Sequence, residues 1–198
     1  GSYLLRDPDK IASFIKILKD SGLIVTAKIR LGFKMNNVLE VSKKIEKAGA
    51  DLLTIHARTS EQRNSEPADW SWITKAKKEI GIPVVGNGGV IDGKTASEML
   101  EIADGAMIAS TAIGNPFVFR EILRYIKTGK EKEITKKERI SAFSDYLKLT
   151  EKFGAFDISR VKYIGSNFLK GFDGASQFRA NLMSLKDVQS IKKMVSSL

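Results

Sequence analysis

Residues 52–58 read LLTIHAR, and similar short apolar runs that end in polar or glycine-rich tips recur along the first 110 residues. The comparable stretches are residues 24–30 (IVTAKIR), 83–89 (PVVGNGG) and 105–110 (GAMIAS). Each is followed by a segment with helical periodicity. Strands and helices that alternate at roughly 25–30-residue intervals are typical of a parallel α/β architecture. The sequence therefore predicts four parallel strands joined by helices.

Helices are expected at residues 9–20, 38–48, 70–80, 94–102 and 117–127, with Asp69 as N-cap of the third. Beyond residue 134 the strand signals stop, and Thr135 with Glu138 forms a capping box before a periodic apolar segment. Further helices are expected at 158–170 and 176–183, with Ser184 and Asp187 capping a last one. We therefore expect two domains, residues 1–127 and 128–198, with a polar linker at 128–134.

The charge balance points to a polyanionic partner. The chain of 198 residues has a net charge of +10, and residues 127–198 hold 15 Lys and Arg against 8 Asp and Glu. A generic lysine-rich surface is the alternative explanation. The chain has no cysteine, which excludes disulfides and thiolate metal sites within it, and no metal site is expected. No apolar run approaches the ~20 residues of a membrane helix, so we expect no membrane partner and a cytoplasmic location.

The carboxyl ends of the predicted strands carry the candidate site, as in other parallel sheets and barrels. Lys28 and Arg30 stand two residues apart on one strand, and His56 and Arg58 repeat that spacing on the next. Side chains at this spacing point the same way, so four basic groups should converge. Ion pairs with acidic residues of adjacent strands are the structural alternative, although the visible tips carry no acidic residue.

The third strand ends in Asn87, Gly88 and Gly89, and glycines leave backbone N–H groups open to an anion. A glycine turn alone is a weak signal, but the next strand follows closely and ends in Ala109 and Ser110. In (β/α)8 barrels the loops after the last two strands often bind phosphate. A phosphate-bearing cofactor such as flavin mononucleotide (FMN) would extend from there towards Lys28 and His56.

These residues resemble one family, the tRNA-dihydrouridine synthases. The matching segments are VTAKIRLGF, GADLLTIHARTSEQR, PADWSWI, IPVVGNGGV, DGAMIASTAIGNPFVF and, near the end, FLKGFDGASQFRANLM. The resemblance covers almost the whole chain, and ordered motifs are more specific than any single one. It implies a (β/α)8 TIM barrel with only its last four β/α units present, followed by an all-α domain that binds tRNA.

The resemblance implies an FMN-dependent enzyme that uses NADPH to reduce uridine in tRNA to 5,6-dihydrouridine. Lys28 and His56 would contact the flavin, Asn87, Gly88 and Gly89 its ribityl phosphate, helped by Ala109 and Ser110. Arg30 and Arg58 would contact substrate or flavin. The target base must leave its stack, so a basic domain that grips tRNA fits this chemistry.

Two departures from the family pattern stand out. The family carries Gly-Arg where this chain has Ala109-Ser110, so cofactor affinity should be lower or another basic residue should compensate. The family's catalytic cysteine follows its fourth strand, and no residue here takes that role, so this chain alone should be inactive. Exposed sheet edges predict a homodimer or complementation by the absent half.

Two other functions are compatible with the same residues. One is a non-catalytic RNA-binding module, in which the α/β part is only a scaffold. The other is a different FMN- or phosphate-binding barrel oxidoreductase, against which the paired basic tips argue.

Overall fold

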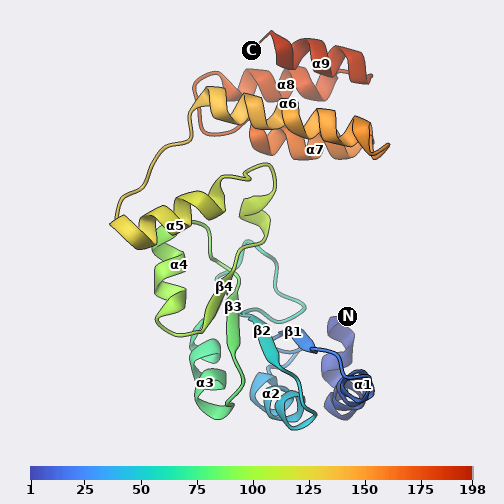
Figure 1. Cartoon of the computed structure of the whole chain (residues 1–198), viewed down its shortest axis with the longest axis vertical. Coiled ribbons are helices and arrows are strands. Elements are labelled where there is room, and N and C mark those ends of the chain that lie inside the picture. Colours follow the sequence, from blue (N-terminus) through green and yellow to red (C-terminus); the bar gives the residue numbers. More distant parts are fainter. Residues whose placement is uncertain (198) are drawn as a thin grey trace. The chain divides into compact units, whose positions relative to one another are not determined.

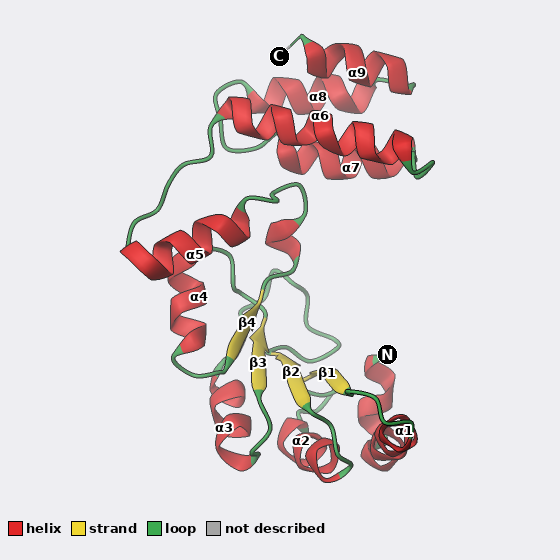
Figure 2. Ribbon diagram, in the orientation of Figure 1, coloured by secondary structure: helices red, strands yellow, loops and turns green. Residues whose placement is uncertain are grey.

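The computed structural model describes residues 1–197 and divides the chain into two compact units, Gly1–Ala109 and a second that begins at Ser110. The first is an α/β unit with one four-stranded parallel sheet in the order β1-β2-β3-β4. Its elements are η1 (Ser2–Arg6), α1 (Pro8–Asp20), β1 (Thr26–Arg30), α2 (Val38–Lys47), β2 (Leu52–His56), α3 (Ser71–Glu79), β3 (Val84–Asn87), α4 (Gly93–Leu100) and β4 (Gly105–Met107), as seen in Figures 1 and 2. The predicted α/β class and its four parallel strands are confirmed.

Along each strand, residues that point into the core alternate with residues that point to the opposite face of the sheet. Ile29, Leu53, Ile55 and Val84 are each at most 7% exposed. Gly86 has the same parity, and a side chain there would collide with Met99 of α4. Because successive strand residues point to opposite faces, the intervening positions, including Lys28, Arg30 and His56, carry the polar side chains on the other face.

Two aspartates fix the amino ends of strands in the same way. The Asp51 carboxylate accepts a hydrogen bond from the backbone N–H of Val25 at 2.6 Å and pairs with Lys19 of α1. Asp104 accepts from Val84 at 2.7 Å, and Lys77 of α3 is its ion-pair partner. Each aspartate therefore links a helix to the strand that follows it and sets where that strand begins.

The outer edge of β1 is open within the described residues, since β1 pairs only with β2. A groove of about 470 Å³ runs along it, bordered by η1, α1 and β1. Ile15 of α1 is buried, whereas Phe14 and Leu18 on the same apolar face are exposed. These two line this groove, because no further strand covers the edge.

The second unit is helical, with a short η2 (Ser110–Ala112) and α5 (Val118–Thr128), α6 (Lys136–Lys152), α7 (Ile158–Phe168), α8 (Ala175–Ser184) and α9 (Val188–Ser196). Its core gathers residues of α6 to α9 around Phe143, whose ring stacks on Phe168 at 5.6 Å. None of the described helices is long and apolar enough to cross a membrane.

Helix capping follows the sequence in most places. The Thr135–Glu138 capping box is present, and Asp187 caps α9 by accepting from the Ser190 N–H at 2.8 Å. Ser184 is instead the last residue of α8. Asp69 is not the N-cap of α3, because α3 begins one residue later, after Trp70, and the Asp69 carboxylate accepts from the Ser71 N–H and hydroxyl.

The division between the units comes earlier than the linker at 128–134 suggested, so α5 belongs to the helical unit. Two contacts explain this. Gly114 lies so close to α7 that an added Cβ would be 2.6 Å from the Asn167 Cβ. Arg120 of α5 pairs with Glu138 of α6 at 3.1 Å. A polar linker marks a change of composition, whereas these contacts follow from packing that the sequence does not display.

Candidate functional site at the strand ends

The parallel register aligns polar residues across the sheet. Arg30 of β1 pairs with His56 of β2, and His56 pairs with Asn87 of β3. Asn87 pairs with Met107 of β4 and donates its Nδ2 hydrogen to the Met107 carbonyl at 2.8 Å. Lys28 lies two residues before Arg30, opposite Thr54. Three residues predicted from different strands therefore meet in one row at the carboxyl edge.

His56 is held neutral within this row. Its pKa is lowered to about 4, first by burial and then by the positive charges of Arg30, Lys28 and Arg58. The Arg58 Nη1 lies 3.2 Å from the His56 Nε2. A guanidinium can only donate, so Nε2 must be the acceptor and the ring proton must be on Nδ1. The site thus presents one neutral imidazole among three cations.

The cations have no carboxylate to balance them. Among residues 1–197, Lys28, Arg30 and Arg58 make no ion pair, so the alternative in which acidic residues of adjacent strands neutralise them is wrong. Burial, followed by the charge of Arg30, lowers the pKa of Lys28. The row therefore has a local excess of positive charge.

Backbone carbonyls of the loop after β2 orient the two arginines instead. The Arg30 Nη1 donates to the Thr59 carbonyl at 2.7 Å, and the Arg58 Nε donates to the Glu66 carbonyl at 2.7 Å. The Gln62 side chain closes the loop by accepting from the Thr59 N–H at 2.8 Å. These bonds use only part of each guanidinium fork and leave further N–H groups for a ligand.

The glycine turn after β3 is shaped by its neighbours. Gly88 and Gly89 have φ of +98° and +78°. A Cβ on Gly88 would lie 2.7 Å from the His56 ring, so the turn touches the cationic row directly. Neither glycine N–H donates a hydrogen bond within the described residues. Two free backbone donors therefore adjoin the cations, which is an arrangement that binds anions.

Trp70 is a site residue that the strand-tip argument missed. Its Nε1 donates to the Gly88 carbonyl at 2.7 Å and so fixes the glycine turn from the start of α3. The signal was present in the sequence as PADWSWI, but neither propensity nor spacing assigns that tryptophan a partner. Ala109 ends the first unit and Ser110 begins η2 in the second, so their predicted role in phosphate binding stays a prediction.

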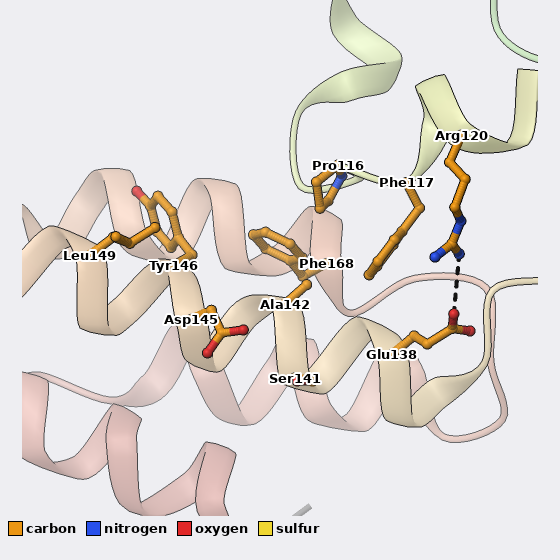
Figure 3. A pocket seen from close by; sticks show the side chains of 10 residues that line it. All are labelled: Pro116, Phe117, Arg120, Glu138, Ser141, Ala142, Asp145, Tyr146, Leu149 and Phe168. Carbon is orange, nitrogen blue, oxygen red and sulfur yellow. Dashed lines mark hydrogen bonds and ion pairs between the residues drawn. The ribbon is translucent and has the colours of Figure 1, made fainter. Parts of the chain in front are cut away.

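The second unit contains a pocket of about 620 Å³ that the sequence did not indicate (Figure 3). Phe117, Tyr146 and Phe168 form its aromatic walls, and Arg120 lies at its rim, paired with Glu121 and Glu138. Hydrogen bonds from Thr135, and then from Arg120, hold the pKa of Glu138 at about 2. Because these carboxylates offset the arginine, the pocket suits an apolar ring better than a phosphate. Within residues 1–197 no cluster of three or more acidic, His or Cys side chains could hold a metal ion.

Comparison with known proteins gives one consistent family. The model of the dihydrouridine synthase (Dus) family matches residues 1–197. A probable tRNA-dihydrouridine synthase 1 of Synechocystis sp. is 32% identical over 98% of this chain and 57% of its own length. A probable tRNA-dihydrouridine synthase of Aquifex aeolicus is 29% identical over 98% of this chain and 63% of its own. A tRNA-dihydrouridine synthase B of Proteus vulgaris is 37% identical over 66% of this chain and 42% of its own.

The chain therefore spans about three fifths of the length of the first two relatives. Among solved structures, a chain from the crystallised Amycolatopsis orientalis BexX/CysO complex superposes with a TM-score of 0.43 at 20% identity, over 65% of this chain and 55% of that one. That likeness carries no argument about function.

Proposed function

The chain belongs to the dihydrouridine synthase family, and we propose that it is the FMN-binding and tRNA-binding portion of an enzyme that reduces uridine to 5,6-dihydrouridine in tRNA. The proposal includes FMN as the cofactor, NADPH as the electron donor and tRNA as the substrate, and it places the enzyme in the cytoplasm. One observation supports it above the others. Lys28, Arg30 and Arg58 surround a neutral His56 beside the Gly88 and Gly89 N–H groups, and no carboxylate among residues 1–197 balances them.

These residues fit FMN because its phosphate is anionic and its reduced ring gains negative charge. The N–H groups of Gly88 and Gly89 would hold the phosphate, with Asn87 fixing the turn and Ala109 and Ser110 completing the site. Lys28 would stabilise negative charge at the pyrimidine edge of the ring. When bound, FMN supplies a hydride acceptor and donor.

The remaining side chains would prepare the site. His56 is neutral and accepts from Arg58, so it can lie against the flavin without adding charge. Arg30 and Arg58 hold the loop after β2 and would contact substrate or flavin with their unused N–H groups. The family's proton-donating cysteine has no counterpart among the 198 residues. We therefore propose that turnover needs residues from outside this chain, in a barrel of which residues 1–127 form the last four β/α units.

FMN titration of the purified chain tests the cofactor site. Lys28→Ala should weaken binding about tenfold or more, because it removes a partly desolvated cation. Lys16→Ala removes the same charge from the exposed side of α1 and should change affinity less than twofold. Equal effects of the two variants would reject a specific flavin site. Absence of FMN binding in a folded chain that still binds tRNA would favour the second candidate, a non-catalytic RNA-binding module.

The open edge of β1 supports a proposal about assembly. Ile24, which precedes β1, is 85% exposed, and the groove beside β1 exposes Phe14 and Leu18. Apolar side chains along an unpaired edge strand favour association. We propose that a second copy or the rest of the barrel covers this edge. Sedimentation should give a dimer that Ile24→Lys converts to monomer, and a monomer at all concentrations would leave only complementation by another polypeptide segment.

A further inference from the structure

Arg139 of α6 is a half-buried cation that lacks an acceptor. Its Nε is shielded from solvent, and it has no hydrogen-bond partner within the part of the chain that the structure describes. Three other cations of the second unit, Arg120, Lys148 and Lys192, have a carboxylate partner. Burial lowers the pKa of Arg139, which expresses the cost of holding this charge away from water. A buried unpaired donor is rare in folded proteins and calls for a partner.

A loop with unused donors lies beside this guanidinium. Gly171 and Gly174 have φ of +75° and +78°, and a Cβ on Gly171 would be 3.7 Å from the Arg139 Nη2. The backbone N–H groups of residues 170–174 donate no hydrogen bonds within residues 1–197. Arg179 of α8 secures the beginning of this loop by donating to the Leu169 carbonyl at 2.8 Å. The free donors are therefore held close to Arg139.

Lys136, one turn before Arg139 on α6, reaches the same loop. Its Nζ lies 4.8 Å from the ring centroid of Phe178 and 5.7 Å from that of Phe172. Neither Lys136 nor Arg139 makes an ion pair within residues 1–197, and the loop's own carboxylate, Asp173, is exposed and pairs with neither. Two cations of α6 therefore lie against one loop whose backbone N–H groups have no acceptor within residues 1–197.

We propose that Arg139, Lys136 and the backbone of residues 170–174 bind a phosphate group, and that in the working protein it is a backbone phosphate of the bound RNA. This rests on the proposed RNA-binding function and adds a defined contact to it. The planar guanidinium fork matches the geometry of phosphate oxygens, and backbone N–H groups complete such sites. Phosphate contacts carry no sequence information, so the site would set the position of the RNA rather than select its sequence.

Variants of the 198-residue chain test the RNA contact. Arg139→Gln should weaken tRNA binding about tenfold and reduce the dependence of log K on log salt by about one unit. Lys152→Gln removes the same charge from the other end of α6, where Lys152 makes no ion pair within residues 1–197, and should change affinity less than twofold. If both variants weaken tRNA binding equally, the loss of net charge alone explains the effect, and the proposed phosphate site is wrong.

Gly171→Asp gives a second test that keeps every cation in place. The new carboxylate would lie next to the Arg139 Nη2 and occupy the phosphate position, while Gly171→Asn supplies the same shape without charge. Both residues tolerate the left-handed backbone better than other side chains. Gly171→Asp should lower tRNA affinity at least fivefold below that of Gly171→Asn. An aspartate variant that binds as well as the asparagine variant would contradict the proposal.

Titration with inorganic phosphate separates this site from the proposed function. In ¹⁵N spectra, saturable shifts should occur at the Arg139 Nε–H and at the amides of Gly171 and Gly174, and Arg139→Gln should abolish them. Such shifts in a chain that does not bind tRNA would support the phosphate site and refute RNA binding. Normal tRNA binding by Arg139→Gln would refute the site and leave RNA binding intact. Shifts that miss Arg139 would refute the site in either case.

Discussion

Replacing Gly88 by alanine should destabilise the first unit more than the same change at the other left-handed glycines of that unit. The residue has φ of +98°, and an added Cβ would lie 2.7 Å from the His56 Cδ2 and 3.2 Å from the Arg58 Nη1. Gly22, at φ +74°, has no atom within 4 Å of the added Cβ, so Gly22→Ala measures backbone strain alone. That strain costs about 1–2 kcal/mol.

The clash at Gly88 adds to this strain. Overpacking of a well-filled site costs roughly 1–3 kcal/mol, so Gly88→Ala should reduce the free energy of unfolding by about 2–5 kcal/mol in all. Gly89→Ala should cost about as much stability as Gly22→Ala, since the nearest atom to its added Cβ is the Trp70 Nε1 at 3.6 Å. Truncating the ring in the double variant Gly88→Ala/His56→Ala should relieve the clash and show a coupling of about 1–2 kcal/mol.

Urea unfolding followed by tryptophan fluorescence isolates the relevant unit. Both tryptophans of the chain, Trp70 and Trp72, lie in the first unit, so the signal reports that unit alone. The reasoning fails if Gly88→Ala costs no more than Gly22→Ala. It also fails if removing the His56 ring does not reduce the penalty, because the glycine would then be needed only for its backbone conformation.

Three further predictions follow from particular contacts. Because the pKa of His56 is about 4 in the folded chain and about 6.5 unfolded, the unfolded chain binds more protons between these values, and the first unit should lose stability as the pH falls from 6.5 to 4. With allowance for solvent screening, the loss of stability is about 1–2 kcal/mol. NMR titration of this lone histidine measures its pKa. A titration midpoint near 6.5 would disprove its neutral state. Trp70→Phe removes the hydrogen bond to the Gly88 carbonyl, and FMN titration should show binding weaker by about 1 kcal/mol. The control variant Trp72→Phe should not show this weakening. Thr135→Ala removes the N-cap of α6 and should cost about 1 kcal/mol in thermal unfolding of the second unit, whereas an unchanged melting temperature would show that the capping box with Glu138 is dispensable.

The sequence predicted the strands well and the ends of elements less well. Periodicity located β2 within residues 52–58, because its inward positions are fully apolar. The fourth strand is shorter than residues 105–110 suggested, since pairing with β3 ends at Met107. The Asp69 N-cap was wrong by one residue, because α3 begins at Ser71 and Trp70 takes the N-cap position, although the Asp69 carboxylate still accepts from the Ser71 N–H and hydroxyl. Propensity identifies capping residues, but it does not say which nearby donor they will take.

For the candidate site, strand spacing was sufficient and loop geometry was not. The alternation of Lys28 with Arg30 predicted that both share a face, and the register then brings Arg30 to His56. That Arg58 turns back to His56 depends on the Glu66 carbonyl, eight residues away in a loop without periodicity. Trp70 was unassigned for the same reason. Contacts made by irregular segments depend on the folded chain around them and leave no repeat in the sequence.

Both units contain cations without a carboxylate partner among residues 1–197, so the stability of each unit should depend on whether an anionic ligand is bound. The first unit holds three cations around a neutral histidine, and the second holds Arg139, whose Nε has no acceptor within residues 1–197. The exposed Lys148, by contrast, is paired with a carboxylate. An unpaired, partly buried charge raises the free energy of the folded state, so an anion that neutralises it must stabilise that state. For a ligand at a hundredfold excess over its Kd the gain is about 2.7 kcal/mol. FMN should therefore shift the tryptophan-detected unfolding of the first unit. Phosphate should stabilise the second unit, measured by the hydrogen-exchange protection of its backbone amides.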